Sequence, residues 1–268
     1  MKVPVGERGR VVFVGAGPGQ ADLITVRGAQ RLGAADVVLF DSLADPALRA
    51  LAPRAQWIAV GKRGFGGVPH AERGEQASTG QATINALLVK HASEGKLVVR
   101  LKGGDPSVFG RLEEELEALA AAGIGCEIVP GVTAATAAAA ATQRPLTRRG
   151  AGRSVSLATA MTHDDGVDAG RHADSEVFYM AGKQLGALAR RLRAAGWPEN
   201  TAVCVVSRAG WADELASDHS IATLGRATVL HAGRPTVVIV GVGARKIAGS
   251  PFDPSPLPAH VALRVPAP

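Results

Sequence analysis

The stretch VVRLKGGDPSVFGR, residues 98–111, decides the fold class of this 268-residue chain. Residues 97–101 form an apolar run rich in β-branched side chains, which predicts a buried strand. The adjacent glycines 103–104 end the strand, because glycine accepts positive φ and leaves room for a close neighbour. The glutamates at 113–115 favour a helix start. This order predicts a ligand loop at the carboxyl end of a sheet strand, where open α/β sheets bind their ligands.

Asp105 is the acid in that loop, and Pro106 stiffens the exit. An acid beside two glycines suits a ligand contact. It equally suits a tight turn in which the carboxylate caps backbone N–H groups. The residues alone leave both interpretations open.

The amino-acid composition and net charge indicate what kind of core the protein has and what kind of partner it binds. Hydrophobic residues make up 46% of the chain, enough for a sizeable core, and aromatic residues only 4%, so the core is expected to be alanine, valine and leucine. The net charge of +6 favours an acidic partner such as a polyanionic small molecule. The arginines are spread out without interleaved aromatic residues, so no nucleic acid partner is expected.

Cys126 and Cys204 each lie in an apolar run, and we expect two buried free thiols in a reducing compartment. Residues 1–10 are polar, and no apolar stretch reaches membrane length. These features predict a cytoplasmic protein with no membrane partner. The histidines show no metal-ligand spacing, so no metal is expected.

Strands and helices alternate along the chain, which predicts an α/β fold. In the first half, strands are expected near 10–14, 36–40, 57–60, 97–101 and 126–129, with helices near 22–32, 81–94, 113–122 and in the alanine run to 141. In the second half, strands are expected at 154–159, 176–180, 202–207 and 236–240, a helix at 184–195, extended chain near 221–224 and a short helix near 226–231. The basic residues 144–153 resemble a linker. We therefore predict domains at 10–147 and 154–245, with tails at 1–9 and 247–268.

Three loops carry candidate functional residues. GAGPG at 15–19 is the first half of a dinucleotide fingerprint, but Gln20 replaces its last glycine and Pro18 removes an N–H donor. Asp41 follows the second strand, where it suits a ribose contact, a general base or a turn cap. Lys62 follows the third strand, where it suits a proton donor, an anion clamp or a solvated charge.

Together these motifs resemble the tetrapyrrole (precorrin) methylase family. They occur in the family's order and are VGAGPG at 14–19, FDSL at 40–43, GKR at 61–63, the stretch 99–111, PGVT at 130–133, PLT at 145–147 and FYM at 178–180. The resemblance implies two α/β domains with an S-adenosylmethionine cleft between them, and a homodimer.

The resemblance also implies roles for single residues. It makes Asp41 the proton acceptor and Lys62 the proton donor. The family's cofactor positions fall on Pro18, Gly103, Gly104, Asp105, Val108, Thr133, Ala134, Met180, Ala209 and Thr236.

The implied activity is S-adenosylmethionine-dependent C-methylation of uroporphyrinogen III, twice, to precorrin-2, in sirohaem or cobalamin biosynthesis. Such a reaction needs two partners held in line and a proton managed afterwards. The substrate is a polycarboxylate, and the residues expected to bind it are Arg63, Arg111, Arg148, Arg149 and Arg153.

Leu112 and Arg148 depart from the family's usual glycine and histidine, on the expected macrocycle side. One alternative is a sister methylase that acts on a later corrin precursor. Another is a dinucleotide-dependent oxidoreductase that uses residues 15–19 and Asp41. A third is a non-catalytic protein that binds a tetrapyrrole or the cofactor.

Overall fold

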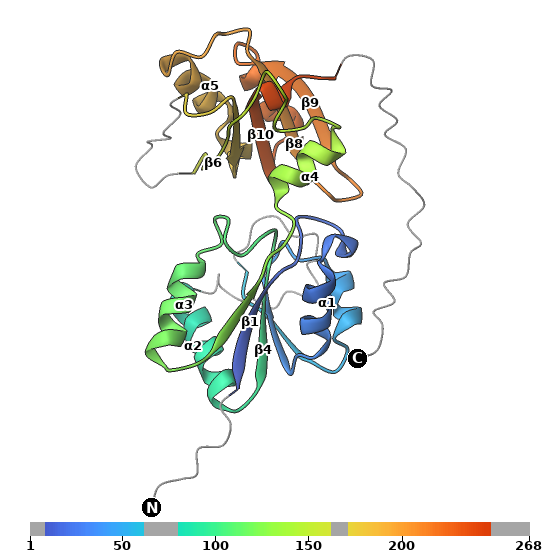
Figure 1. Ribbon diagram of the computed structural model, residues 1–268, viewed down its shortest axis with the longest axis vertical. Coiled ribbons are helices and arrows are strands. Elements are labelled where there is room, and N and C mark those ends of the chain that lie inside the picture. The colour runs from blue at the N-terminus through green and yellow to red at the C-terminus, as the bar shows by residue number, and fades with distance from the viewer. Residues whose placement is uncertain (1–8, 62–79, 162–170, 248–268) are drawn as a thin grey trace, which may run out of the picture. The chain divides into compact units, whose positions relative to one another are not determined.

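The computed structural model describes residues 9–61, 80–161 and 171–247 (Figure 1). The chain divides between Thr133 and Ala134 into two compact units, called unit 1 and unit 2 here and treated separately. No helix within the described ranges is long and apolar enough to cross a membrane.

Unit 1 contains a five-stranded sheet in the order β3-β2-β4-β1-β5. The strands are β1 (Arg10–Gly15), β2 (Val37–Phe40), β3 (Gln56–Ala59), β4 (Leu97–Lys102) and β5 (Cys126–Val129). Every neighbouring pair is parallel. All five carboxyl ends therefore lie along one side of the sheet, called the carboxyl edge below.

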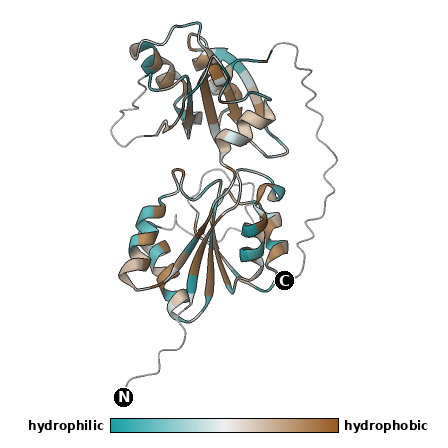
Figure 2. Cartoon of the chain, in the orientation of Figure 1, coloured by the Kyte–Doolittle hydropathy of each residue, from teal (hydrophilic) through white to brown (hydrophobic). Residues whose placement is uncertain are grey.

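Helices cover both faces of this sheet (Figure 1). One face carries η1 (Ala21–Leu23), α1 (Val26–Gly33) and η2 (Pro46–Leu51), and the other carries α2 (Gln81–Ser93) and α3 (Leu112–Ala121). In β1, Val12 packs with Leu32 of α1, whereas Phe13 packs with Leu88 of α2. This two-sided burial explains why consecutive residues of the strands are apolar, and Figure 2 shows the strands as largely hydrophobic.

Three charged side chains are buried between β4 and α3. Glu115 has no exposed surface, Arg100 Nε donates to its Oε1 at 3.0 Å, and Lys102 Nζ lies 2.5 Å from its Oε2. Burial, and then the charge of Arg100, lower the pKa of Lys102, and Glu115 opposes that shift. We call these residues the buried charge triad.

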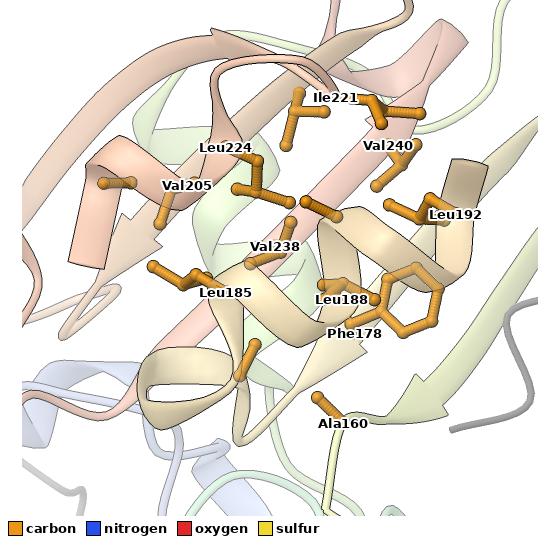
Figure 3. Close-up of a cluster of buried hydrophobic side chains, with 14 of the residues drawn as sticks. Ala160, Phe178, Leu185, Leu188, Leu192, Val205, Ile221, Leu224, Val238 and Val240 are labelled. Atoms are coloured by element: carbon orange, nitrogen blue, oxygen red, sulfur yellow. The ribbon is translucent and has the colours of Figure 1, made fainter. Parts of the chain in front are cut away.

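Unit 2 contains a mixed sheet in the order β6-β7-β10-β8-β9, in which only β6 and β7 are parallel. The strands are β6 (Val155–Thr159), β7 (Ser175–Tyr179), β8 (Ala202–Ser207), β9 (Leu215–Ser220) and β10 (Thr236–Gly241). The helices are α4 (Ala134–Ala141), η4 (Ala181–Lys183), α5 (Leu185–Ala194), η5 (Leu224–Arg226), α6 (Ala227–Leu230) and η6 (Val242–Ala244). Figure 3 shows the core that joins α5 to the sheet, including Phe178, Leu188, Val205 and Val238.

The boundary between the units lies earlier than the predicted linker at 144–153. That segment is part of unit 2, because Arg144 donates to the carbonyl of Ala244 at 3.0 Å and forms an ion pair with Asp218. Ser175 Oγ also donates to the carbonyl of Leu146 at 2.7 Å. A basic, glycine-containing sequence does not reveal such long-range partners.

Two further expectations were wrong. Residues 221–224 are not extended: the strand is β9 at Leu215–Ser220, and its sequence LASDHS gives little apolar signal because the strand lies at the sheet's edge. Cys126 is exposed, because β5 is also an edge strand, whereas Cys204 is buried as expected. Both cysteines are free thiols.

The buried charge triad predicts that neutralising Glu115 strongly lowers the free energy of unfolding. Glu115→Gln keeps the side-chain shape but leaves two buried cations without a counter-ion, so we expect unfolding free energy to fall by about 3 kcal/mol. Urea unfolding followed by circular dichroism measures the change. Glu117→Gln, at an exposed position of the same helix, is the matched control. Equal losses in the two variants would contradict the prediction.

Candidate functional site

Four loops leave the carboxyl edge of unit 1 next to one another, after β1, β2, β4 and β5. The loops after β1 and β4 are joined by a backbone bridge, in which Gly104 N donates to the carbonyl of Gly17 at 2.7 Å. The loops after β4 and β5 are joined by Asp105, whose Oδ2 accepts from Gly131 N at 2.9 Å. The predicted motifs at 14–19, 99–111 and 130–133 therefore form one connected surface.

Glycine is required where these loops meet. A Cβ on Gly15 would lie 2.6 Å from the backbone N of Gly131 and 2.7 Å from the carbonyl oxygen of Gly104. Gly104 itself has φ +73°, and a Cβ there would meet no described atom closer than the Val132 carbonyl at 4.0 Å. The side of Gly104 that lacks a side chain is therefore open, which leaves room for a ligand against the backbone.

Asp105 serves the structure of its own loop. Its Oδ1 accepts from Ser107 N at 2.8 Å, while its Oδ2 holds Gly131. The turn-cap interpretation is therefore confirmed for this residue. Val108 continues the turn, with its N–H donating to the carbonyl of Asp105 at 3.2 Å.

Asp41 ties the loop after β2 to the loop after β4. Its Oδ1 accepts from Leu43 N at 2.9 Å, and its Oδ2 accepts from Gly103 N at 3.1 Å. Gly61, after β3, lies against the same loop, since a Cβ there would be 2.6 Å from Ser42 N. The predicted proton donor Lys62 and substrate residue Arg63 lie outside the described residues.

The sequence prediction missed two exposed apolar residues at this edge. Leu43 and Phe109 are 39% and 43% exposed, and Phe109 has φ +53°, a costly conformation for a bulky residue. The signal that could have found them is an apolar side chain within a polar, glycine-rich loop. Arg111 also has φ +53°, and its guanidinium makes a bidentate pair with Glu114, both contacts at 2.7 Å. Pro18 and Thr133 complete the predicted residues of unit 1, and both are half-buried.

The remaining cofactor candidates belong to unit 2. Met180 has φ +56° and is 44% exposed, and it precedes a turn in which Gly182 packs against Thr236: a Cβ on Gly182 would be 3.0 Å from Thr236 Oγ1. Ala209 follows the end of β8, which is held by Arg208 N donating to the carbonyl of Pro235 at 2.8 Å. Ala134 begins α4.

A chain of polar groups centred on the buried His231, which we call the His231 network, lies next to these turns in unit 2. His231 has no exposed surface; its Nδ1 contacts Ser207 Oγ, and its Nε2 lies 2.8 Å from Ser217 Oγ. Ser207 Oγ lies 3.2 Å from Thr236 Oγ1, and Ser217 Oγ lies 2.8 Å from His219 Nε2. Burial, then the charges of His219 and Arg234, lower the pKa of His231 to about 4.

The described arginines that were predicted to bind substrate belong to both units. Arg111 lies in unit 1, whereas Arg148, Arg149 and Arg153 lie around a turn of unit 2 closed by a bridge between Arg148 and Gly152. Arg148 donates to the carbonyl of Arg245, and Arg149 and Arg153 are exposed. Among the described residues, no group of histidine, cysteine and acidic side chains is placed to hold a metal ion.

Comparison with known proteins gives a consistent result. Residues 10–225 match the sequence model of the Tetrapyrrole (Corrin/Porphyrin) Methylases. The chain is 38% identical to a uroporphyrinogen-III C-methyltransferase of Pseudomonas aeruginosa, over 91% of this chain and 98% of that protein. It is 41% identical to a sirohaem synthase of Baumannia cicadellinicola, of which it covers 50%. A crystal structure of uroporphyrin-III C-methyltransferase from Thermus thermophilus with S-adenosylhomocysteine superimposes with a TM-score of 0.71 at 32% identity, over 87% of this chain and 97% of that one.

The His231 network predicts acid sensitivity. The folded pKa of about 4 lies below the ordinary 6.5, so the unfolded chain takes up a proton first as pH falls. The contribution of neutral His231 to the free energy of unfolding is therefore complete above about pH 6.5 and is lost as the pH falls toward 4. Between pH 7 and pH 5 the free energy of unfolding should fall by about 2 kcal/mol. Urea unfolding at the two pH values, compared with His231→Asn, isolates this contribution. An equal loss in the variant would contradict it.

Proposed function

The chain belongs to the tetrapyrrole methylase family, and from that premise we propose that it methylates uroporphyrinogen III twice on carbon, with S-adenosylmethionine as methyl donor, to give precorrin-2. The observation that carries the proposal is the carboxyl edge of unit 1, where Asp41 and Asp105 hold the loops around the open side of Gly104. The product would serve sirohaem or cobalamin synthesis.

The residues present fit S-adenosylmethionine. The bare side of Gly104 lets a ligand reach backbone groups that a side chain would cover. We propose as its binding residues Pro18, Gly103, Gly104, Asp105, Val108 and Thr133 of unit 1, and Ala134, Met180, Ala209 and Thr236 of unit 2. Because both oxygens of Asp105 are engaged by backbone N–H groups, its proposed part is to hold the loop in its binding shape.

When bound, S-adenosylmethionine supplies an electrophilic methyl group on a sulfonium. The chain's tasks are to hold the macrocycle carbon in line with that methyl and to accept the proton that leaves elsewhere in the macrocycle as its double bonds rearrange. Asp41 is the proposed acceptor: it is half-buried and fixed by Leu43 N and Gly103 N, which leaves further lone pairs of its carboxylate for a substrate proton. Lys62 is the proposed donor.

Two surface features suit a flat polyanionic macrocycle. Leu43 offers exposed apolar surface beside Asp41 and Gly103, and Phe109 offers exposed apolar surface in the loop after β4. The net charge of +6 attracts carboxylates, and the proposed binding arginines are Arg63, Arg111, Arg148, Arg149 and Arg153.

We also propose a homodimer that works in the cytoplasm. The dimer rests on the family resemblance. The compartment is supported by the free thiols of Cys126 and Cys204, which a reducing environment maintains.

The proposed chemistry predicts that substitution of Asp41 lowers the rate of methylation. The purified chain, mixed anaerobically with uroporphyrinogen III and S-adenosylmethionine, should add two methyl groups, read by mass spectrometry. Asp41→Asn removes the base and keeps an oxygen for only one of the two backbone N–H groups, those of Leu43 and Gly103, so the rate should fall by about 10²-fold or more.

Asp36→Asn is the matched control for this assay. Asp36 precedes β2 at the opposite end of the same strand, and its carboxylate likewise accepts a backbone N–H, from Leu97 at 2.8 Å. That variant should keep the wild-type rate. Full activity in Asp41→Asn would overturn the role of Asp41. Binding of S-adenosylmethionine without methylation would move the substrate to a later corrin precursor or indicate a non-catalytic binder, and binding of NAD(H) instead would indicate an oxidoreductase.

The open side of Gly104 predicts a binding defect in Gly104→Ala. The new Cβ fills the space proposed for the cofactor, so the Kd for S-adenosylhomocysteine, measured by calorimetry, should rise by about tenfold or more. Gly196→Ala is the control, because Gly196 also has positive φ (+82°) and no described atom within 4 Å of an added Cβ. It carries the same backbone strain and should bind normally. Unchanged affinity in both variants would count against this placement.

A further inference from the structure

The His231 network reaches the turns of unit 2 that carry three proposed cofactor residues. At its inner end, Thr236 Oγ1 donates to the carbonyl of Arg234 at 2.8 Å and faces Gly182, two residues after Met180. A Cβ on Gly182 would lie 2.8 Å from the Arg234 carbonyl oxygen and 3.0 Å from Thr236 Oγ1. The turn after β7 is thus packed directly against the start of β10.

The neighbouring strand is fixed to the same point. Ser207 ends β8, its Oγ lies 3.2 Å from Thr236 Oγ1, and the next residue donates its N–H to the carbonyl of Pro235 at 2.8 Å. Ala209 follows immediately. The position of Ser207 therefore sets both the start of β10 and the turn that carries Ala209.

His231 holds the side chain of Ser207 in place through its Nδ1 atom. The imidazole is fully buried, with Ser207 on its Nδ1 side and Ser217 on its Nε2 side. A neutral imidazole has one donor and one acceptor nitrogen, so it can satisfy one hydroxyl on each side, whereas an apolar side chain would leave both hydroxyls without this partner.

We propose that His231 is a positioning residue for cofactor binding: through Ser207 and Thr236 it holds the turns of Met180 and Ala209 in their binding conformation. The proposal rests on the proposed function. His231 itself touches neither the cofactor nor the reacting carbon.

The test compares variants of His231 that keep either the hydrogen bond to Ser207 or the hydrogen bond to Ser217. His231→Leu should raise the Kd for S-adenosylhomocysteine about tenfold, and Ser207→Ala should do the same, because each removes a link to Thr236. His231→Asn should restore most of the affinity, since its amide takes the place of Nδ1 and can still bind Ser207. His231→Gln should not, since its amide reaches toward Ser217. In turnover, the KM for S-adenosylmethionine should rise while kcat stays near wild type.

His91→Leu is the matched control, because His91 is also buried but lies in α2 of unit 1, where its Nδ1 is 3.3 Å from Glu94 Oε2. It should bind S-adenosylhomocysteine normally. Thermal unfolding identifies which variants are folded at the temperature of the titration. Equal affinities in folded His231→Asn and His231→Gln, or wild-type affinity in Ser207→Ala, would overturn the positioning role. Absence of binding by the wild-type chain would instead overturn the proposed function and this inference with it.

Discussion

The close approach of three backbone segments at Gly15, Gly104 and Gly131 is the constraint on which unit 1 depends. A side chain on Gly15 would lie 2.6 Å from Gly131 N, so the loops after β1, β4 and β5 can meet only as backbone. Where these loops meet, few backbone N–H groups are left for side chains to bind. Asp41 and Asp105 do that work by accepting four backbone N–H groups from these and the neighbouring loops. The loop shapes are thus fixed by hydrogen bonds and not by bulk.

The buried charge triad lies at the end of β4, next to the loop that begins at Gly103. Arg100 and Lys102 alternate with apolar residues on β4 and face α3, where Glu115 meets both. Within the triad two cations face one acid directly before Gly103, and the Asp41 carboxylate adds a further attraction for Lys102. A buried charge of this kind is costly, and salt screens it much less than it screens a surface charge. It favours anions at the carboxyl edge without exposing a side chain.

Much of this arrangement could be predicted from the sequence. The strands and helices of unit 1 follow from consecutive apolar residues and glycine turns, and a parallel sheet brings the loops after β1, β2 and β4 to one edge. The position of Asp41 beside Gly103 follows from that topology. The partners of Arg144 and the edge strand β9 could not be predicted, because a long-range ion pair and a polar strand leave no periodic signal. The His231 network was missed for a similar reason: its members are separated in sequence and join only when β8, β9 and β10 are paired.

The strand order of unit 1 also constrains how the chain acquires its structure during synthesis. β1 is the first of the described strands in the chain, and both of its neighbours, β4 and β5, come from much later in the sequence. β2 and β3 can pair locally, but β1 has no partner strand until β4, which ends at Lys102, has been made, and its second edge stays unpaired until β5, which ends at Val129, follows. Residues 11–14 of this strand are all apolar. The same adjacency that places Gly15 between its two partner loops therefore leaves the edges of this apolar strand open to wrong pairing until both partner strands have been made.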